Sequence, residues 1–319
     1  MNKKSLLIIA IVGVISIIIC SLCAYGIYRL VKNDESSDDS KDTSETSTNE
    51  QKTSQTTSST DTDTAIGTKK LIFIHHSTGE NWLADYDGGL GSELAGNGYF
   101  VSDTNYGWGT DSIGDSTDIG HWWNWFRGPD SSTYLEELYK EGDQNSEYAR
   151  DSSDPGGENE IIMFKSCFPN SDLKGSASAQ VPNISNNPLK GEASDGQYHT
   201  VANAKGIYID LLNYFETRQN KLFVVITAPP LGSNNTDSST AANARTFNNW
   251  LVNDWLDDYN HDNVAVFDFY DVLTNHGQSN YAEFPTDEWD DHPSTEGNLM
   301  ATEEFIPFLD SAYKTWKKD

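Results

Sequence analysis

The sequence predicts a three-layer α/β domain, with a parallel sheet of about five strands between helices, preceded by one transmembrane helix and a disordered stalk. Short apolar runs alternate with stretches whose apolar residues recur at the helical period, a pattern typical of strand–helix–strand units. The runs are unbroken rather than alternately polar, which indicates a parallel sheet covered on both faces. The composition changes abruptly near residue 67 and separates this domain from the segments before it.

The first segment predicts a membrane anchor over residues 1–33. Residues 6–28 carry no charge and consist mainly of Leu, Ile and Val, and at about 1.5 Å per residue they are long enough to cross a bilayer as one helix. Basic residues flank the segment almost evenly, so they favour a cytoplasmic N-terminus only weakly. A cleaved signal peptide, or lipidation at Cys20 or Cys23, is the alternative. Every version places the following domain outside the cell, with the anchored version making it a single-pass membrane protein.

Residues 34–67 predict a disordered linker, and residues 68–319 predict one domain. The linker is almost entirely Ser, Thr, Asp, Glu, Gln, Asn and Lys, so it cannot bury enough apolar surface to offset the entropy of ordering. The formal net charge of −28 argues against a nucleic-acid partner, because phosphate would be repelled. Beyond the membrane segment Cys167 is the one cysteine, which excludes a disulfide within the domain.

The elements of the domain follow from the apolar pattern. The expected strands are residues 70–74, 99–104, 160–164, 222–227 and 264–269. The expected helices, where apolar residues form a stripe, are residues 201–219, 241–258 and 297–316, and residues 81–97 are expected to form a helix or a helix-like connection. Two long polar insertions, residues 105–159 and 168–200, leave strands at their carboxyl ends. Open α/β sheets bind ligands at that edge.

Candidate catalytic residues follow the first two strands directly. Ser77 lies in the run His75-His76-Ser77-Thr78-Gly79, where a strand-to-helix turn would expose its hydroxyl; the alternative is an ordinary helix N-cap. Gly107 and Gly109 follow the second strand, and a tight glycine turn there brings a backbone N–H close to a ligand. An ordinary turn is the alternative.

Two further candidates lie after the third strand and before the last helix. Asn170 follows the third strand, where its amide is placed to donate to an oxyanion or to bond its own backbone. His292 follows Asp290 and Asp291, and a neutral histidine beside a carboxylate is the base and orienter that activate a hydroxyl nucleophile. The alternative is a solvated acidic loop.

The order of these four segments resembles that of the SGNH (GDSL-type) hydrolases, over most of residues 69–319. The resemblance implies a flavodoxin-like sheet and ester hydrolysis through an acyl-enzyme, with no cofactor and no metal. It assigns the nucleophile to Ser77, the base to His292, and the oxyanion hole to the N–H of Ser77, to Gly109 (or Gly107) and to Asn170. The family's Gly-Asp-Ser reads His75-His76-Ser77 here, and its Asp-x-x-His would need an aspartate where Trp289 stands.

The choice of the third catalytic residue follows from backbone geometry. Side chains two apart in an extended chain lie on the same side, and Pro293 pushes His292 towards extended backbone. Asp290 is therefore predicted to orient His292, and Asp291 is predicted to matter little.

The expected function is an extracellular serine esterase that acts on an acylated glycan or a small ester. We expect His76, Trp108, Trp122 and Trp123 to bind the substrate; the alternative for the tryptophan cluster is a local core. A non-catalytic glycan-binding or adhesion module on a degenerate scaffold is the alternative function, motivated by the altered motifs. Cys167 is an alternative nucleophile.

Overall fold

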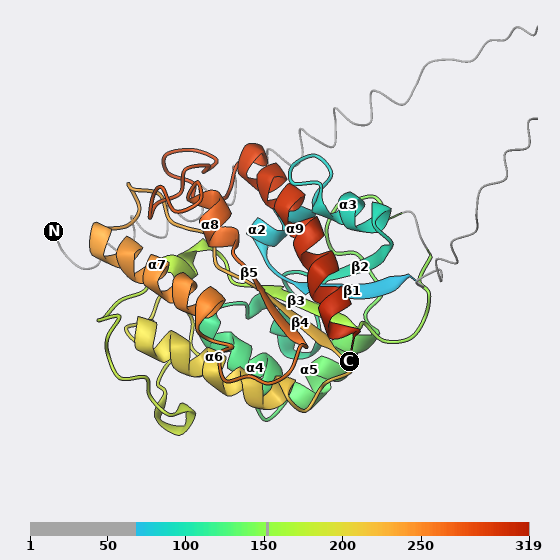
Figure 1. The fold of residues 1–319 in the computed structure, drawn as a ribbon, viewed down its shortest axis with the longest axis horizontal. Coiled ribbons are helices and arrows are strands. Elements are labelled where there is room, and N and C mark those ends of the chain that lie inside the picture. The colour runs from blue at the N-terminus through green and yellow to red at the C-terminus, as the bar shows by residue number, and fades with distance from the viewer. Residues whose placement is uncertain (1–67, 151–152, 319) are drawn as a thin grey trace, which may run out of the picture. The chain divides into compact units, whose positions relative to one another are not determined.

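The computed structural model describes residues 68–150 and 153–318, and it contains a five-stranded sheet in which every neighbouring pair is parallel (Figure 1). The strand order is β2-β1-β3-β4-β5. The strands are β1 (Lys69–Ile74), β2 (Tyr99–Thr104), β3 (Ile161–Lys165), β4 (Leu222–Ile226) and β5 (Val264–Phe267). The predicted α/β fold with a parallel sheet of five strands is confirmed. The expected anchor and linker fall outside the described residues.

Helices cover both faces of the sheet and produce the three layers (Figure 1). One face carries α2 (Ser77–Leu83), α3 (Leu90–Gly96), α8 (Phe269–Leu273) and α9 (Thr295–Trp316). The other carries α4 (Trp122–Phe126), α5 (Ser131–Lys140), α6 (Val201–Phe215) and α7 (Ser238–Asn253). Short 3₁₀ helices lie in the connections: η1 (Thr110–Asp115), η2 (Ile119–His121), η3 (Phe168–Ser171) and η4 (Ile184–Asn186). None of the helices in the described part of the chain is both long and apolar enough to cross a membrane.

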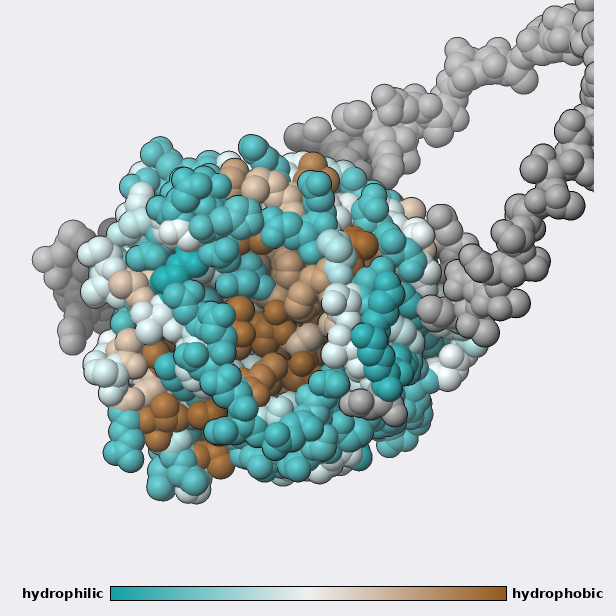
Figure 2. Space-filling view, viewed as in Figure 1, coloured by the Kyte–Doolittle hydropathy of each residue, from teal (hydrophilic) through white to brown (hydrophobic). Residues whose placement is uncertain are grey.

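The unbroken apolar strands are explained by burial on both faces. Along β1, Ile72 and Ile74 enter the core beneath α4 to α7, whereas Leu71 and Phe73 enter the core beneath α2, α3 and α9. Successive strand residues point to opposite faces, so both faces demand apolar side chains. The edge strand β5 is less covered, and Figure 2 shows an apolar area over it between α7 and α9.

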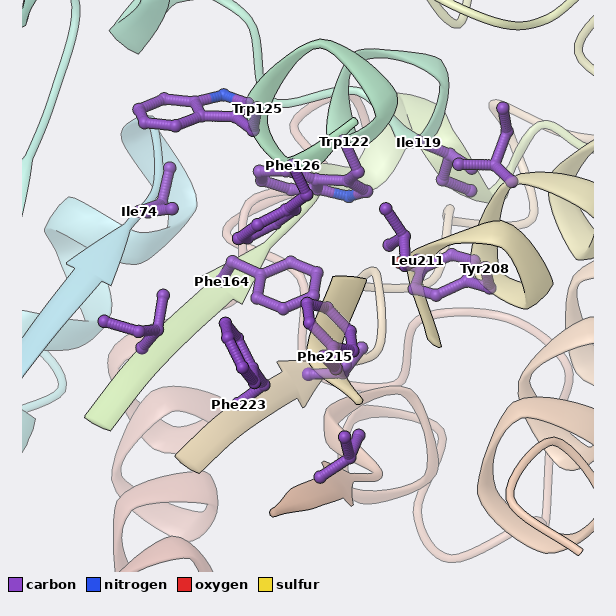
Figure 3. Packing of buried hydrophobic residues seen from close by; sticks show 14 of the residues in the cluster. Ile74, Ile119, Trp122, Trp125, Phe126, Phe164, Tyr208, Leu211, Phe215 and Phe223 are labelled. Atoms are coloured by element: carbon purple, nitrogen blue, oxygen red, sulfur yellow. The ribbon is translucent and has the colours of Figure 1, made fainter. Parts of the chain in front are cut away.

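The first insertion holds two helices, α4 and α5, that were not among the expected elements. α4 reads WWNWF, so it has no polar face whose periodicity could reveal a helix. Trp122 and Phe126 are buried against Phe164 of β3, with ring centroids 4.9 and 5.2 Å away (Figure 3). The Trp122 indole N–H donates to the Ser166 hydroxyl at 2.9 Å. The prediction that Trp122 binds substrate is therefore wrong: its side chain is fully buried, and the local core is the correct alternative.

The expected helix over residues 81–97 is two helices. α2 ends at Leu83, and α3 begins after Gly89, whose backbone lies in the left-handed region at φ 63°. A helix cannot pass through that conformation, so the chain turns. The earlier start of α2 at Ser77 matters for the site, because it makes this serine the first residue of the helix.

Two tryptophan substitutions test the role of α4 in the core. Trp122→Ala should lower the free energy of unfolding by about 3–5 kcal/mol, because it removes a large buried side chain and leaves a cavity. Trp289→Ala is the matched control: its side chain is 71% exposed, and its loss should cost less than about 0.5 kcal/mol. Denaturant unfolding measures both. Equal costs would show that Trp122 does not support the core.

Candidate active site

Ser77 is held at the carboxyl end of β1, which lies between β2 and β3 in the sheet. β1 ends at Ile74, and after His75 and His76 the chain enters α2 with Ser77 as its first residue. β1 and β3 are neighbours, and the chain order changes direction between them. Such a switch point at the carboxyl edge is where open α/β sheets leave room for a ligand.

The structure brings His292 and Asp290 to Ser77. The Ser77 Oγ lies 2.8 Å from His292 Nε2, and Asp290 Oδ1 lies 2.6 Å from His292 Nδ1. The backbone N–H of His292 also donates to Asp290 Oδ1 at 3.1 Å. Because an ionised carboxylate only accepts, Nδ1 carries the ring hydrogen, and Nε2 is left to accept the hydrogen of the Ser77 hydroxyl. This is the arrangement of a nucleophile, a general base and an orienting carboxylate.

The charge of Asp290 is favoured by its partner. Partial burial acts to raise the pKa of Asp290, but the hydrogen bonds from the His292 side chain and backbone outweigh it, and the net pKa lies below its ordinary value. A carboxylate with a lowered pKa stays ionised at neutral pH, so it keeps the His292 tautomer that leaves Nε2 free to accept. Asp290 can also stabilise an imidazolium formed on proton transfer.

Asp291 has a different part, which the sequence did not predict. Its side chain is buried, and its Oδ1 accepts from the backbone N–H of Gly232 at 2.7 Å and from the Asn235 amide at 2.9 Å. These bonds attach the His292 loop to the connection between β4 and α7. The expectation that Asp291 matters little is therefore replaced: it contributes to stability because its buried carboxylate is satisfied by two donors from this connection.

Cys167 lies beside Ser77, but Ser77 is the residue that is hydrogen-bonded to His292. Its Sγ is 3.6 Å from Ser77 Oγ and 2.8 Å from Thr78 Oγ1. Burial acts to raise the pKa of the Cys167 thiol, but the nearby Lys165 ammonium and hydrogen bonds from Thr78 and Ser77 lower it overall. The contact with His292 Nε2 is made by Ser77, so the geometry favours the serine as nucleophile.

Asn170 is not brought into this set. It is buried, and its amide nitrogen donates to Asp118 Oδ1 at 2.6 Å and to the Cys167 carbonyl at 3.3 Å. Its carbonyl oxygen accepts from the N–H of Ile119 at 2.8 Å. Both amide hydrogens therefore already have acceptors, and Asn170 fixes the loop that carries η2 instead of facing Ser77.

The two candidate glycines also serve the loop after β2. The N–H of Gly107 donates to Asp115 Oδ1 at 2.7 Å. Gly109 has φ 74° and packs beside α5, where an added Cβ would lie 3.4 Å from the Glu137 carboxylate. Among the described residues, no contact joins Gly109 to Ser77, so its predicted place in an oxyanion hole stays a prediction.

Tyr106 is the neighbour of Ser77 that sequence reasoning missed. Its ring stacks on the His76 imidazole with centroids 4.1 Å apart, and its hydroxyl interacts with both the side chain and the backbone of Ser77. Partial burial raises the pKa of Tyr106, so the hydroxyl keeps its hydrogen. Tyr106 is 61% exposed, and the available sequence signal was an aromatic residue directly before the predicted glycine turn at Gly107.

His76 supports this neighbour. Its Nε2–H donates to the Gly114 carbonyl at 2.6 Å, and its Nδ1 accepts from the Thr117 hydroxyl at 3.0 Å. Burial lowers the pKa of His76, which keeps the ring neutral. Both ring nitrogens of His76 therefore already have partners, and its ring supports Tyr106 by stacking instead of being free to bind substrate.

The remaining two predicted substrate-binding residues lie apart from the triad. The Trp108 indole N–H donates to Glu141 Oε2 at 2.6 Å, and its ring stacks on Trp125 at 5.8 Å, so it anchors a loop. Trp123 is half-buried and lies under the Lys190 ammonium at 4.8 Å. Neither contacts Ser77 or His292 among the described residues.

Within residues 68–150 and 153–318, no group of histidine, cysteine, aspartate and glutamate side chains is arranged to hold a metal ion. Comparison of the chain with models of protein families, with curated proteins and with solved structures finds no match. The structure itself defines a class: an α/β protein with a Ser–His–Asp arrangement at the carboxyl edge of a parallel sheet.

Paired aspartate substitutions test the orienting role. Asp290→Asn should lower kcat by about 100- to 10,000-fold on any ester that is turned over, because the amide favours the His292 tautomer whose Nε2 cannot accept a proton. Asp291→Asn should leave kcat within a few-fold while lowering the melting temperature, because it perturbs a buried anchor. Circular dichroism confirms the fold of each variant. Small, equal effects on kcat would place the orienting carboxylate elsewhere.

Proposed function

We propose that this protein is a serine esterase of the SGNH type, which removes acyl groups from carbohydrate. The observation that carries the proposal is the hydrogen-bonded series from Ser77 through His292 to Asp290, with contacts of 2.8 and 2.6 Å. The strand order β2-β1-β3-β4-β5 supports it, because this is the flavodoxin-like order that the resemblance implies.

The first half of the reaction forms an acyl-enzyme. Ser77 Oγ attacks the ester carbonyl carbon while His292 Nε2 takes the hydroxyl proton, and Asp290 stabilises the resulting imidazolium. The negative charge moves to the carbonyl oxygen. We assign the Ser77 N–H as one donor to that oxygen and the Tyr106 hydroxyl, which interacts with Ser77, as a second. Collapse of the tetrahedral intermediate breaks the bond to the alcohol oxygen, which leaves with the proton from His292.

The second half restores the enzyme. His292 Nε2 takes a proton from water, whose oxygen attacks the acyl carbonyl carbon. The intermediate collapses, the bond to Ser77 Oγ breaks, and His292 returns the proton to that oxygen. The products are the free carboxylic acid and the unaltered serine.

The surroundings of the triad favour a neutral, hydroxyl-rich substrate. Phe168 packs edge-on against the His292 ring at 4.8 Å, and it borders a depression of about 250 Å³. Asp195 and Asp172 also line that depression, and Asp172 is paired with the Lys174 ammonium. Aromatic faces stack on sugar rings, and carboxylates accept hydrogen bonds from sugar hydroxyls but repel anionic groups. We place the protein on the outer surface of the cell, tethered by residues 1–33.

Labelling with a fluorophosphonate probe tests the proposed function. The wild-type protein should be labelled, because the activated Ser77 oxygen displaces fluoride from phosphorus. Ser77→Ala should abolish labelling. Cys167→Ala is the matched control: its sulfur lies 3.6 Å from Ser77 Oγ, so it has a similar position but should leave labelling in place.

Two results would contradict the esterase. Labelling that survives in Ser77→Ala and disappears in Cys167→Ala would make the cysteine the nucleophile. A folded wild-type protein that is never labelled would favour the non-catalytic glycan-binding module.

A further inference from the structure

A second histidine–aspartate pair lies directly behind the nucleophile. His75 and Asp103 are both fully buried, and His75 Nε2 lies 3.0 Å from Asp103 Oδ2. The other ring nitrogen, Nδ1, lies 2.9 Å from the carbonyl oxygen of His76. Asp103 comes from the neighbouring strand β2, in register with Phe73 of β1. The pair thus connects the sheet to the peptide group that precedes Ser77.

The hydrogen bonds determine the protonation of this pair. A carbonyl oxygen cannot donate, so Nδ1 of His75 carries a hydrogen. Asp103 receives further hydrogen bonds from the Asn145 N–H at 2.8 Å and the Ser146 hydroxyl at 2.6 Å, and the Tyr148 hydroxyl lies 3.0 Å away. Several donors favour the ionised carboxylate, so Nε2 of His75 carries a hydrogen as well. His75 is an imidazolium in a buried ion pair, unlike the neutral His292.

The bond from His75 acts on the peptide group between His76 and Ser77. In a trans peptide the C=O and the N–H point in opposite directions. The His76 carbonyl points inward to His75, so the Ser77 N–H points outward, to the side on which the Tyr106 hydroxyl contacts it. As the first N–H of α2, it has no partner within the helix.

The start of α2 needs this additional support. The His76 side chain makes no capping hydrogen bond to the helix. Its carbonyl accepts from the N–H of Gly79 at 2.7 Å and of Glu80 at 3.1 Å, and the His75 imidazolium adds a charge-assisted bond. An added Cβ on Gly79 would lie 2.3 Å from His75 Cβ. A glycine at 79 is therefore what lets His75 pack under the turn.

We propose that the His75–Asp103 pair is a positioning device for the oxyanion hole, which fixes and polarises the His76–Ser77 peptide so that the Ser77 N–H faces the developing oxyanion. This inference rests on the proposed esterase function. Hydrogen bonds in series strengthen one another, so a cation on the carbonyl oxygen makes the N–H of the same peptide a better donor. His292 and Asp290 carry out the proton transfer, whereas His75 and Asp103 position the N–H that stabilises the negative charge on the oxyanion.

Comparison of an oxoester with the matching thionoester tests the device. Sulfur is larger and a weaker acceptor than oxygen, so a hole built for an oxyanion rejects the thionoester. In full-length His75→Gln the oxoester kcat/KM should fall by about 100-fold, as expected when a reacting group is misplaced. The kcat/KM for the thionoester should fall much less, so the ratio of oxoester to thionoester kcat/KM, the preference for oxygen, should fall by at least about tenfold. Asp103→Asn should behave alike.

Ser102→Ala is the matched control, because Ser102 is fully buried on β2 next to Asp103 but its hydroxyl has no hydrogen-bond partner among the described residues, so the bonds of His75 to Asp103 and His76 stay intact. It should keep the wild-type preference for oxygen. A purely structural role for His75 would lower the folded fraction and reduce both activities equally. An unchanged preference in folded His75→Gln would overturn the positioning inference and leave the esterase standing.

An NMR experiment tests this inference independently of the proposed esterase activity. Long-range ¹H–¹⁵N correlation of the full-length protein should show both His75 nitrogens protonated and His292 protonated at Nδ1 alone. The Ser77 amide resonance should move in His75→Gln but not in Ser102→Ala. These observations need no turnover, so they hold even if the fluorophosphonate probe finds no esterase. A His75 ring with one bare nitrogen, or a stationary Ser77 amide, would contradict the device.

Discussion

The hydrogen bond between Ser77 Oγ and His292 Nε2 is the contact that the site depends on, because it joins segments 215 residues apart. The parallel sheet fixes the position of Ser77, because β1 ends just before this residue, at the carboxyl edge where the strand order changes direction. Buried Asp291 fixes the other side by binding the connection after β4. A bond of 2.8 Å between such distant segments requires both supports.

In the proposed device, the hydrogen-bond partners of His75 and His292 give these two neighbours of Ser77 different roles. His292 faces one carboxylate and one hydroxyl, which suits a neutral ring that accepts a proton. His75 faces a carboxylate and a carbonyl, which suits a cation. Full burial makes that charge strongly dependent on Asp103, because an unpaired buried charge is costly. In the proposed device, His75 thus gives the segment before Ser77 a physical role in this chain.

The sheet and the triad could be predicted from the sequence, because buried strands are unbroken apolar runs and residues after them meet at one edge. Asp290 could be chosen over Asp291 from backbone alternation alone. The fully aromatic α4 escaped prediction, because it has no polar face and its tryptophans fit a binding surface as well as a core. The sequence could not predict the contacts of Asn170, Tyr106 and Asp103, because these contacts join residues far apart along the chain.

The most direct measurement is identification of the covalent intermediate. The full-length protein is mixed with p-nitrophenyl acetate, quenched in acid during the pre-steady state, digested and mapped by mass spectrometry. The account predicts a burst of p-nitrophenol and an acetyl group on the peptide at Ser77. An acetyl group on Cys167, or turnover with no acyl adduct on either residue, would contradict it.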